Sequence, residues 1–220
     1  MSEYKNPIKK EMIIMNDELN KKINYLYNSV KAKHIDTKKL YQGRFIDLIE
    51  EEYLLPNNKT ITRERIIKNM HKEAVIVIAI TDDNKYILLA QNRIDNKVSL
   101  EFPSGYIEDG ETCIEGAVRE LLEETGYVSN SVNYLDSYYS QLGIDSSITH
   151  IVVANNCIKQ YNQTLSPHEY INYMKFTFEE LTELINENII NGVGNKLAFY
   201  ELLYLNNNKN KSRVLKSTNN

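Results

Sequence analysis

The chain has 220 residues, 42% of them hydrophobic, and a formal net charge of −4. This length suits one domain with an added N-terminal piece, and the apolar content is sufficient for a core. The acidic balance argues against a general affinity for nucleic acid. The apolar run at residues 12–15 is too short for a signal peptide, and the longest run, residues 74–80, is too short to cross a bilayer. We therefore expect a cytoplasmic protein that is not held by a membrane.

Residues 1–40 are expected to form an N-terminal extension with one amphipathic helix. Apolar residues recur at helical spacing over residues 17–33, and Asp17 can cap the helix. The helix suits packing either on the domain or against a second subunit, and the sequence leaves both open. Residues 41–70 then read as a β-hairpin, with strands at 42–54 and 60–67 around a proline-containing turn.

Residues 71–205 are expected to form the main domain, of α/β class. The predicted strands are residues 73–80, 85–92, 132–141, 149–154 and 170–176, and the predicted helices lie between Thr112 and Gly126 and at residues 178–191 and 196–205. Strands interrupted and followed by helices predict a mixed sheet covered on both faces, an α/β/α sandwich. Residues 206–220 are rich in Asn, Lys and Ser and are predicted to be a disordered tail.

The helix after Thr112 carries an unusual acidic face. Glu120, Glu123 and Glu124 follow an i, i+3, i+4 spacing, so their carboxylates share one side. Like charges at this spacing repel, and a hard divalent cation would relieve the repulsion. Oxygen ligands favour Mg²⁺ or Mn²⁺ over zinc. On chemistry alone this is a metal site for a phosphate compound, and the alternative is a solvated acidic helix.

The spacing around these glutamates carries a resemblance. Gly105, Glu111, the Arg119–Glu120 pair and the following Glu123, Glu124 and Gly126 match the pattern GX5EX7REUXEEXGU. This pattern resembles the signature of the Nudix hydrolases, with Tyr127 where an aliphatic residue is commoner. At about 7% usage per residue type, seven fixed matches arise by chance with a probability on the order of 10⁻⁸.

The resemblance implies roles for these residues. Glu120, Glu123 and Glu124 would be metal ligands for Mg²⁺, which Mn²⁺ can replace, with the Ser104 carbonyl as a further oxygen ligand. Arg119 would hold Glu111 or the neighbouring carboxylates in place. The three glutamates and Arg119 are therefore the expected catalytic group, together with Glu169.

Outside the signature the chain is similar to the ADP-ribose pyrophosphatase branch of the family. Three segments carry this: the hairpin that begins at residues 41–45, the residues 91–105 that lead into the signature, and residues 168–170, where similar enzymes place an extra glutamate. In that branch the N-terminal hairpin helps to form a dimer and shapes the nucleoside pocket, so we expect a homodimer. One departure is the sequence Gln-Leu-Gly at residues 141–143, where a proline is usual.

The same resemblance suggests substrate contacts. Arg93 matches phosphate geometry, and Glu101 can accept a ribose hydroxyl; the alternative is a surface salt bridge between the two. Tyr41 and Phe45 are candidate platforms for the adenine base, although either can be a core residue. Glu169 is either a general base, an extra metal ligand or plain loop surface.

The expected activity is metal-dependent hydrolysis of the diphosphate in ADP-ribose or a similar nucleotide sugar, which gives a nucleoside monophosphate and a sugar phosphate. Two alternatives stay open. One is a pyrophosphatase of oxidised or ordinary nucleoside triphosphates. The other is a nucleotide-sugar-binding module that lost catalysis, although no glutamate of the signature is missing.

Overall fold

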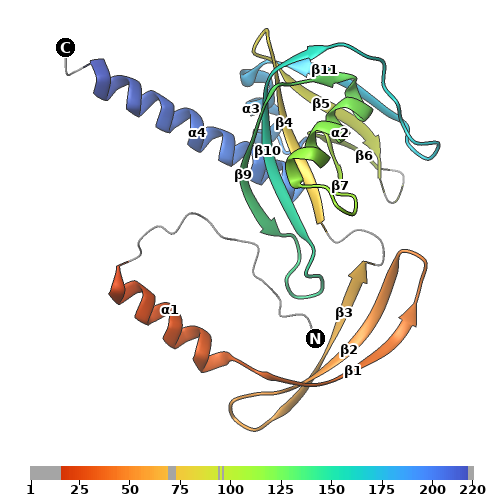
Figure 1. Cartoon of the computed structure of the whole chain (residues 1–220), viewed down its shortest axis with the longest axis vertical. Coiled ribbons are helices and arrows are strands. Elements are labelled where there is room, and N and C mark those ends of the chain that lie inside the picture. Colours follow the sequence, from red (N-terminus) through yellow and green to blue (C-terminus); the bar gives the residue numbers. More distant parts are fainter. Residues whose placement is uncertain (1–15, 69–72, 94, 96, 218–220) are drawn as a thin grey trace. The chain divides into compact units, whose positions relative to one another are not determined.

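The computed structural model describes residues 16–68, 73–93, 95 and 97–217, with side chains to residue 207. The chain divides into two units (Figure 1). The smaller unit comprises residues 1–70 and 142–145, and the larger unit comprises residues 71–141 and 146–220. In the described residues, no helix is long and apolar enough to span a bilayer.

The smaller unit contains a helix and an antiparallel sheet. Its elements are α1 (Asp17–Val30), β1 (Lys33–Gln42), β2 (Ile46–Leu54) and β3 (Thr60–Lys68), and the sheet order is β1-β2-β3. The helix is capped by Asn16, whose side chain accepts from the Glu18 backbone N–H at 2.8 Å, and not by Asp17 as the sequence predicted. No residue of α1 is buried.

The hairpin predicted from the sequence is therefore a three-stranded sheet, because β1 pairs with the whole length of β2. This strand lies in the segment that the sequence assigned to the extension without a strand. All ten residues of β1 are exposed. A strand without a buried face needs no alternation of apolar and polar residues, so the pattern that marks most strands is missing here.

The segment 142–145 belongs to this smaller unit although it follows β9 in the chain. The Ile66 backbone N–H donates to the Ile144 carbonyl at 2.9 Å, and Lys68 pairs with Asp145 at 3.3 Å. These contacts attach residues 144 and 145 to β3.

The larger unit is built on one mixed sheet. The central strands of the sheet run in the order β11-β5-β4-β10-β8, and β4 and β10 are parallel; β6, β7 and β9 pair with β5, β4 and β10 respectively. Its strands are β4 (Glu73–Thr81), β5 (Tyr86–Asn92), β6 (Val98–Glu101), β7 (Ser104–Tyr106), β8 (Tyr127–Val128), β9 (Ser131–Tyr139), β10 (Ile148–Lys159) and β11 (Ile171–Phe176). Its helices are α2 (Cys113–Thr125), α3 (Phe178–Asn186) and α4 (Val193–Ser217).

Both faces of this sheet are covered, as Figure 1 shows. Side chains alternate along β4: Val75 and Val77 belong to a core that includes Leu121 of α2, whereas Ile76 belongs to a core that includes Phe199 of α4. The second core also contains residues of α3. The larger unit is therefore an α/β/α sandwich, with α2 on one face and α3 and α4 on the other.

The helix α2 begins and ends as its sequence predicts. Thr112 and Glu115 form the capping box, with backbone–side-chain bonds of 3.2 and 2.7 Å. At the other end Gly126 has φ +69°, and its backbone N–H donates to the Leu122 carbonyl at 2.7 Å. Tyr127, the unusual last residue of the signature, is buried, and its ring lies 5.9 Å from that of Tyr173. The aromatic ring thus fills the core position of the usual aliphatic residue.

Two C-terminal predictions differ from the structure. Helix α3 ends at Asn186 and not at residue 191, because Asn188 has the left-handed φ of 57°. Helix α4 begins at Val193 and continues to Ser217 through the segment predicted to be disordered. Helical hydrogen bonds are made within the segment itself, so a composition rich in Asn, Lys and Ser does not prevent a helix there.

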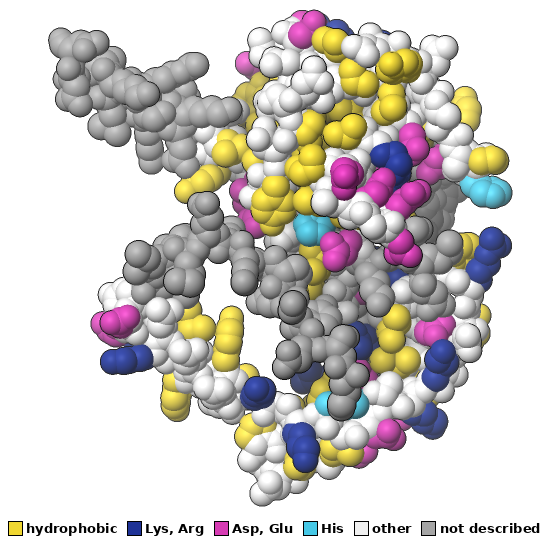
Figure 2. Space-filling model, in the orientation of Figure 1, with side chains coloured by type: hydrophobic (Ala, Val, Ile, Leu, Met, Phe, Trp, Pro, Cys, Tyr) yellow, Lys and Arg dark blue, Asp and Glu magenta, His cyan; other side chains and the backbone are white. Residues whose placement is uncertain are grey.

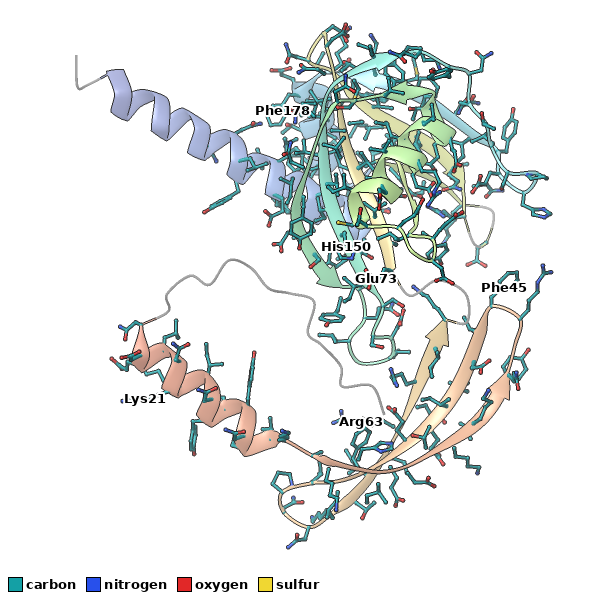
Figure 3. All side chains as sticks on the ribbon, viewed as in Figure 1. Lys21, Phe45, Arg63, Glu73, His150 and Phe178 are labelled. Carbon is teal, nitrogen blue, oxygen red and sulfur yellow. The ribbon has the colours of Figure 1, made fainter. Side chains whose placement is uncertain are left out.

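A buried histidine links the two parallel strands. His150 of β10 and Glu73 of β4 lie side by side (Figure 3), with the His150 Nε2 atom 2.7 Å from the Glu73 carboxylate. The His150 ring also lies 6.1 Å from that of Tyr134. These contacts connect β4 and β10 through their side chains.

The end of α2 gives a test of the fold. In Gly126→Ala the new methyl group would meet the Tyr161 carbonyl, and the left-handed backbone is unfavourable for alanine. We expect the free energy of unfolding in urea to fall by at least about 1–2 kcal/mol. Gly143→Ala is the control, since nothing lies within 4 Å of its Cβ position and its φ is not positive. Equal stability of the two variants would contradict this account of the helix end.

Candidate active site

One cavity of about 570 Å³ in the larger unit brings together most of the predicted site residues. It is lined by parts of β5, β7 and α2 and by the segment between β10 and β11. Figure 2 shows acidic side chains gathered around a basic one on this face of the larger unit. The predicted residues that line the cavity are Arg93, Ser104, Arg119, Glu120, Glu123, Glu124 and Glu169.

Arg119 is the centre of the ionic network. Its Nε and Nη2 atoms donate to the two carboxylate oxygens of Glu111 at 2.8 and 2.9 Å. Its Nη1 atom donates to Glu120 at 2.8 Å and to Glu123 at 3.2 Å, and Nη2 also reaches the Tyr106 carbonyl at 2.7 Å. The guanidinium hydrogen bond holds the pKa of Glu111 below its usual range. One guanidinium therefore fixes three carboxylates of the signature.

Glu124 is the most enclosed of the acidic residues. Its side chain is almost fully buried, and its Oε2 atom accepts from the Ser104 backbone N–H at 2.8 Å. Burial, with a smaller contribution from the charges of Glu120 and Glu169, raises the pKa of this carboxyl group to about 9, although the backbone hydrogen bond and Arg93 act in the opposite direction. A positive charge placed beside Glu124 would therefore stabilise the ionised form of its carboxyl group.

Glu120 packs directly against the backbone of β7. A Cβ atom at Gly105 would collide with the Glu120 carboxyl group, so this place in the signature has no room for a side chain. Burial raises the pKa of Glu120, while the hydrogen bond and charge of Arg119 lower it. The glycine thus lets the carboxyl group lie against the sheet, beside Glu124.

The donor set fits a hard divalent cation. Glu120, Glu123 and Glu124 line the cavity from α2 beside Arg119, and carboxylate oxygens are ligands of Mg²⁺ and Mn²⁺. Burial and mutual repulsion disfavour the charged forms of Glu120 and Glu124, which a cation would favour. Within the described part of the chain, no three acidic, histidine or cysteine side chains already stand in metal-ligand geometry. In this arrangement Arg119 itself takes one oxygen of Glu120 and one of Glu123.

Arg93 and Glu101 form a bidentate pair at the edge of the cavity. Arg93 donates from Nε at 2.8 Å and from Nη2 at 2.6 Å to the two Glu101 oxygens. Glu101 is buried, whereas about half of the Arg93 side chain is exposed. The salt bridge that the sequence left as an alternative is therefore present, but Arg93 still lines the cavity and can offer its remaining N–H groups to an anion.

Glu169 reaches the cavity from the segment between β10 and β11. Its Oε2 atom accepts from the Ser166 backbone N–H at 3.0 Å, and its charge raises the pKa of both Glu120 and Glu124. Glu169 therefore faces the same space as the signature carboxylates.

Tyr41 and Phe45 are not among the residues that line this cavity. Both belong to the smaller unit, at the end of β1 and in the following turn, where Figure 3 labels Phe45. Their side chains are 60% and 62% exposed, so neither is the core residue that was the alternative reading. The Arg44 guanidinium lies 5.0 Å from the centroid of the Phe45 ring.

Gln91 and residues 164–166 also line the cavity, although they were not predicted as site residues. Neutral side chains without a motif give no signal of a site, and only the return of the chain beside α2 brings them there.

Comparisons with known proteins agree with this geometry. A family model described as the NUDIX domain matches residues 70–193. The chain belongs to the Nudix family. The signature at residues 105–127 thus lies in a domain of the matching family, and the recognition made from it is confirmed.

Relatives of known name extend the similarity beyond the signature. An ADP-ribose pyrophosphatase of Bacillus subtilis (strain 168) is 33% identical over 159 residues, which cover 71% of this chain and 84% of that protein. A protein named methanol dehydrogenase activator, of Bacillus methanolicus, is 35% identical over the same length and with the same coverage. Both therefore share most of their length with this Nudix protein.

A solved structure supports the fold. The crystal structure of an ADP compounds hydrolase superposes with a TM-score of 0.74 at 23% identity, over 81% of this chain and 96% of that one. Similarity at this level of identity concerns the fold alone. The predicted α/β class and Nudix-like sandwich are confirmed.

Proposed function

We propose that this Nudix protein hydrolyses the diphosphate bond of ADP-linked compounds, with ADP-ribose as the first candidate and AMP and ribose 5-phosphate as products. The observation that carries the proposal is the single cavity that holds Glu120, Glu123 and Glu124 together with the guanidinium of Arg93. Carboxylates suit a cation, and the guanidinium suits a phosphate, so the cavity has both groups that a diphosphate requires. The similarity to the B. subtilis ADP-ribose pyrophosphatase supports the choice of substrate.

The cation is proposed to be Mg²⁺, which Mn²⁺ can replace. Glu120, Glu123, Glu124 and the Ser104 carbonyl would hold it. When bound, it supplies charge to the diphosphate oxygens and makes water more acidic. Arg119 is assigned a positioning role, because it holds Glu111, Glu120 and Glu123 through direct hydrogen bonds.

The remaining residues have roles on the substrate side. Arg93, whose guanidinium is oriented by its bidentate pair with Glu101, would bind the phosphates. Glu101 would accept a hydrogen bond from a ribose hydroxyl through an oxygen lone pair that Arg93 does not use. Glu169 would take the proton of the attacking water or contribute a further oxygen to the cation. Tyr41 and Phe45 stay candidate platforms for adenine, with exposed rings as the supporting observation. A cytoplasmic location also stays a prediction.

A substrate panel tests the proposal. With Mg²⁺, the protein should convert ADP-ribose to AMP and ribose 5-phosphate, and it should cleave ADP-glucose or NADH more slowly, as resolved by product chromatography. Release of pyrophosphate from nucleoside triphosphates at a higher kcat/KM would instead favour the triphosphate alternative. Binding of ADP-ribose without turnover in Mg²⁺ or Mn²⁺ would favour the non-catalytic binding module.

Substitutions on α2 test the assignment of the carboxylates. Glu120→Gln and Glu124→Gln should each lower kcat by about 100-fold or more. Even substitution of a residue that only hydrogen-bonds to a metal ligand commonly lowers activity or metal affinity by about 10–100-fold. Glu115→Gln is the matched control on the same helix: it lies outside the cavity, and glutamine can also complete a capping box. Activity of either cavity variant within a factor of two of Glu115→Gln would refute the assignment.

Exposed apolar side chains of the smaller unit support the homodimer that the resemblance predicts. Tyr25, Leu26, Tyr27 and Val30 of α1 are 60% or more exposed. Apolar exposure of this kind is typical of an interaction surface. Analytical ultracentrifugation should give twice the mass of one 25.6 kDa chain, and the doubly substituted Leu26→Glu, Val30→Glu variant should shift the mass toward that of one chain. A single-chain mass for the unmodified protein at micromolar concentration would exclude a stable homodimer.

A further inference from the structure

The segment 160–170 forms part of the active-site wall without any regular secondary structure. It joins β10 to β11 and places Thr164, Leu165, Ser166 and Glu169 at the cavity. Nearly all of its side chains are exposed; only Gln163 and Leu165 are partly buried. Its position therefore depends on a small number of contacts that can be identified one by one.

Backbone contacts attach the segment to the end of α2. The backbone N–H groups of Gln160 and Tyr161 donate to the Gly126 carbonyl at 3.1 and 3.0 Å. The Thr164 N–H donates to the Glu123 carbonyl at 2.9 Å. These carbonyls belong to the last turn of a helix and its cap, where carbonyls have no partner within the helix. The segment thus binds to the helix that carries the acidic face.

One side chain adds to these backbone contacts. The Gln163 Nε2 atom donates to the Glu124 carbonyl at 2.6 Å and to the Ile171 carbonyl at 3.2 Å. A single amide therefore connects the last turn of α2 with Ile171, the first residue of β11. Glu169 lies between Gln163 and Ile171 in the chain. Leu165, two residues further on, packs against the core beneath α2.

We propose that Gln163 is a positioning residue for catalysis: it fixes residues 164–169 against α2 and so holds Glu169 toward Glu120 and Glu124. This inference rests on the proposed function, because Glu169 has a catalytic part only there. Gln163 itself does not line the cavity and acts through the backbone. A glutamine that only stabilised the helix end would affect unfolding and not the catalytic step.

The first test removes the two hydrogen bonds that the Gln163 side chain donates, with little change in the size of the side chain. Gln163→Met should lower kcat for ADP-ribose by about 10–100-fold, as loss of a supporting contact commonly does, with KM and Tm near the wild-type values. Amide hydrogen exchange should become faster in residues 164–169. The control is Gln160→Met, since the Gln160 side chain has no partner among the described residues; it should leave both measurements unchanged.

A double-mutant cycle separates positioning from a general structural effect. If Gln163 acts through Glu169, Gln163→Met should have little further effect on kcat in a Glu169→Gln background. Additive losses would overturn the proposal, and so would a kcat equal to that of Gln160→Met.

A second variant guards against misfolding. Gln163→Glu keeps the shape of the side chain but replaces the donor by a carboxylate, so it should reproduce the loss of kcat. A large fall in Tm in both variants would assign Gln163 to fold stability and overturn the proposal. If the wild-type protein turned over no ADP-linked compound, the proposed function would fail, and hydrogen exchange would still decide the attachment: unchanged exchange at residues 164–169 in Gln163→Met would overturn it.

Discussion

The charge balance around Arg119 is the constraint on which the site depends. One guanidinium contacts Glu111, Glu120 and Glu123, and α2 contains no lysine and no second arginine. Glu124, the most buried carboxyl, is left with a backbone N–H as its hydrogen-bond partner. The helix can carry such charge only because its opposite side is firmly held: Ala117 and Leu121 are packed into the core of the sheet. Apolar packing on one side thus stabilises a cation-seeking arrangement on the other.

The ends of α2 carry as much of the architecture as its faces. At the N-terminus the capping box and the Arg119–Glu111 pair fix the turn that follows β7. At the C-terminus the carbonyls of Glu123, Glu124 and Gly126 accept hydrogen bonds from residues 160–164. These groups are free of partners within any helix, and here they hold a second wall of the cavity. The same helix therefore supplies acidic side chains to the cavity and attachment points from its backbone.

Two departures from prediction concern secondary structure. β1 was missed, and α3 was extended too far. In β1 no face is buried, so the chain shows no period-two pattern, and pairing with β2 alone decides its conformation. Gln163 shows the same limit in the site: a glutamine gives no signal of its importance until the two carbonyls that it joins are brought together.

The sequence by itself determined the helix α2 with both of its ends, its acidic face, the sandwich class and the family. The helix, its ends and its acidic face depend on spacing within about twenty residues, where propensity, capping and side-chain direction are local; the sandwich class follows from the order of strands and helices along residues 71–205. The tertiary structure decided which distant residues join this helix. Arg93, Glu169 and Gln163 lie tens of residues away, and only strand pairing in the mixed sheet brings β5 and the segment before β11 to the acidic face. Local chemistry therefore fixed the acidic face, and long-range packing fixed the cavity around it.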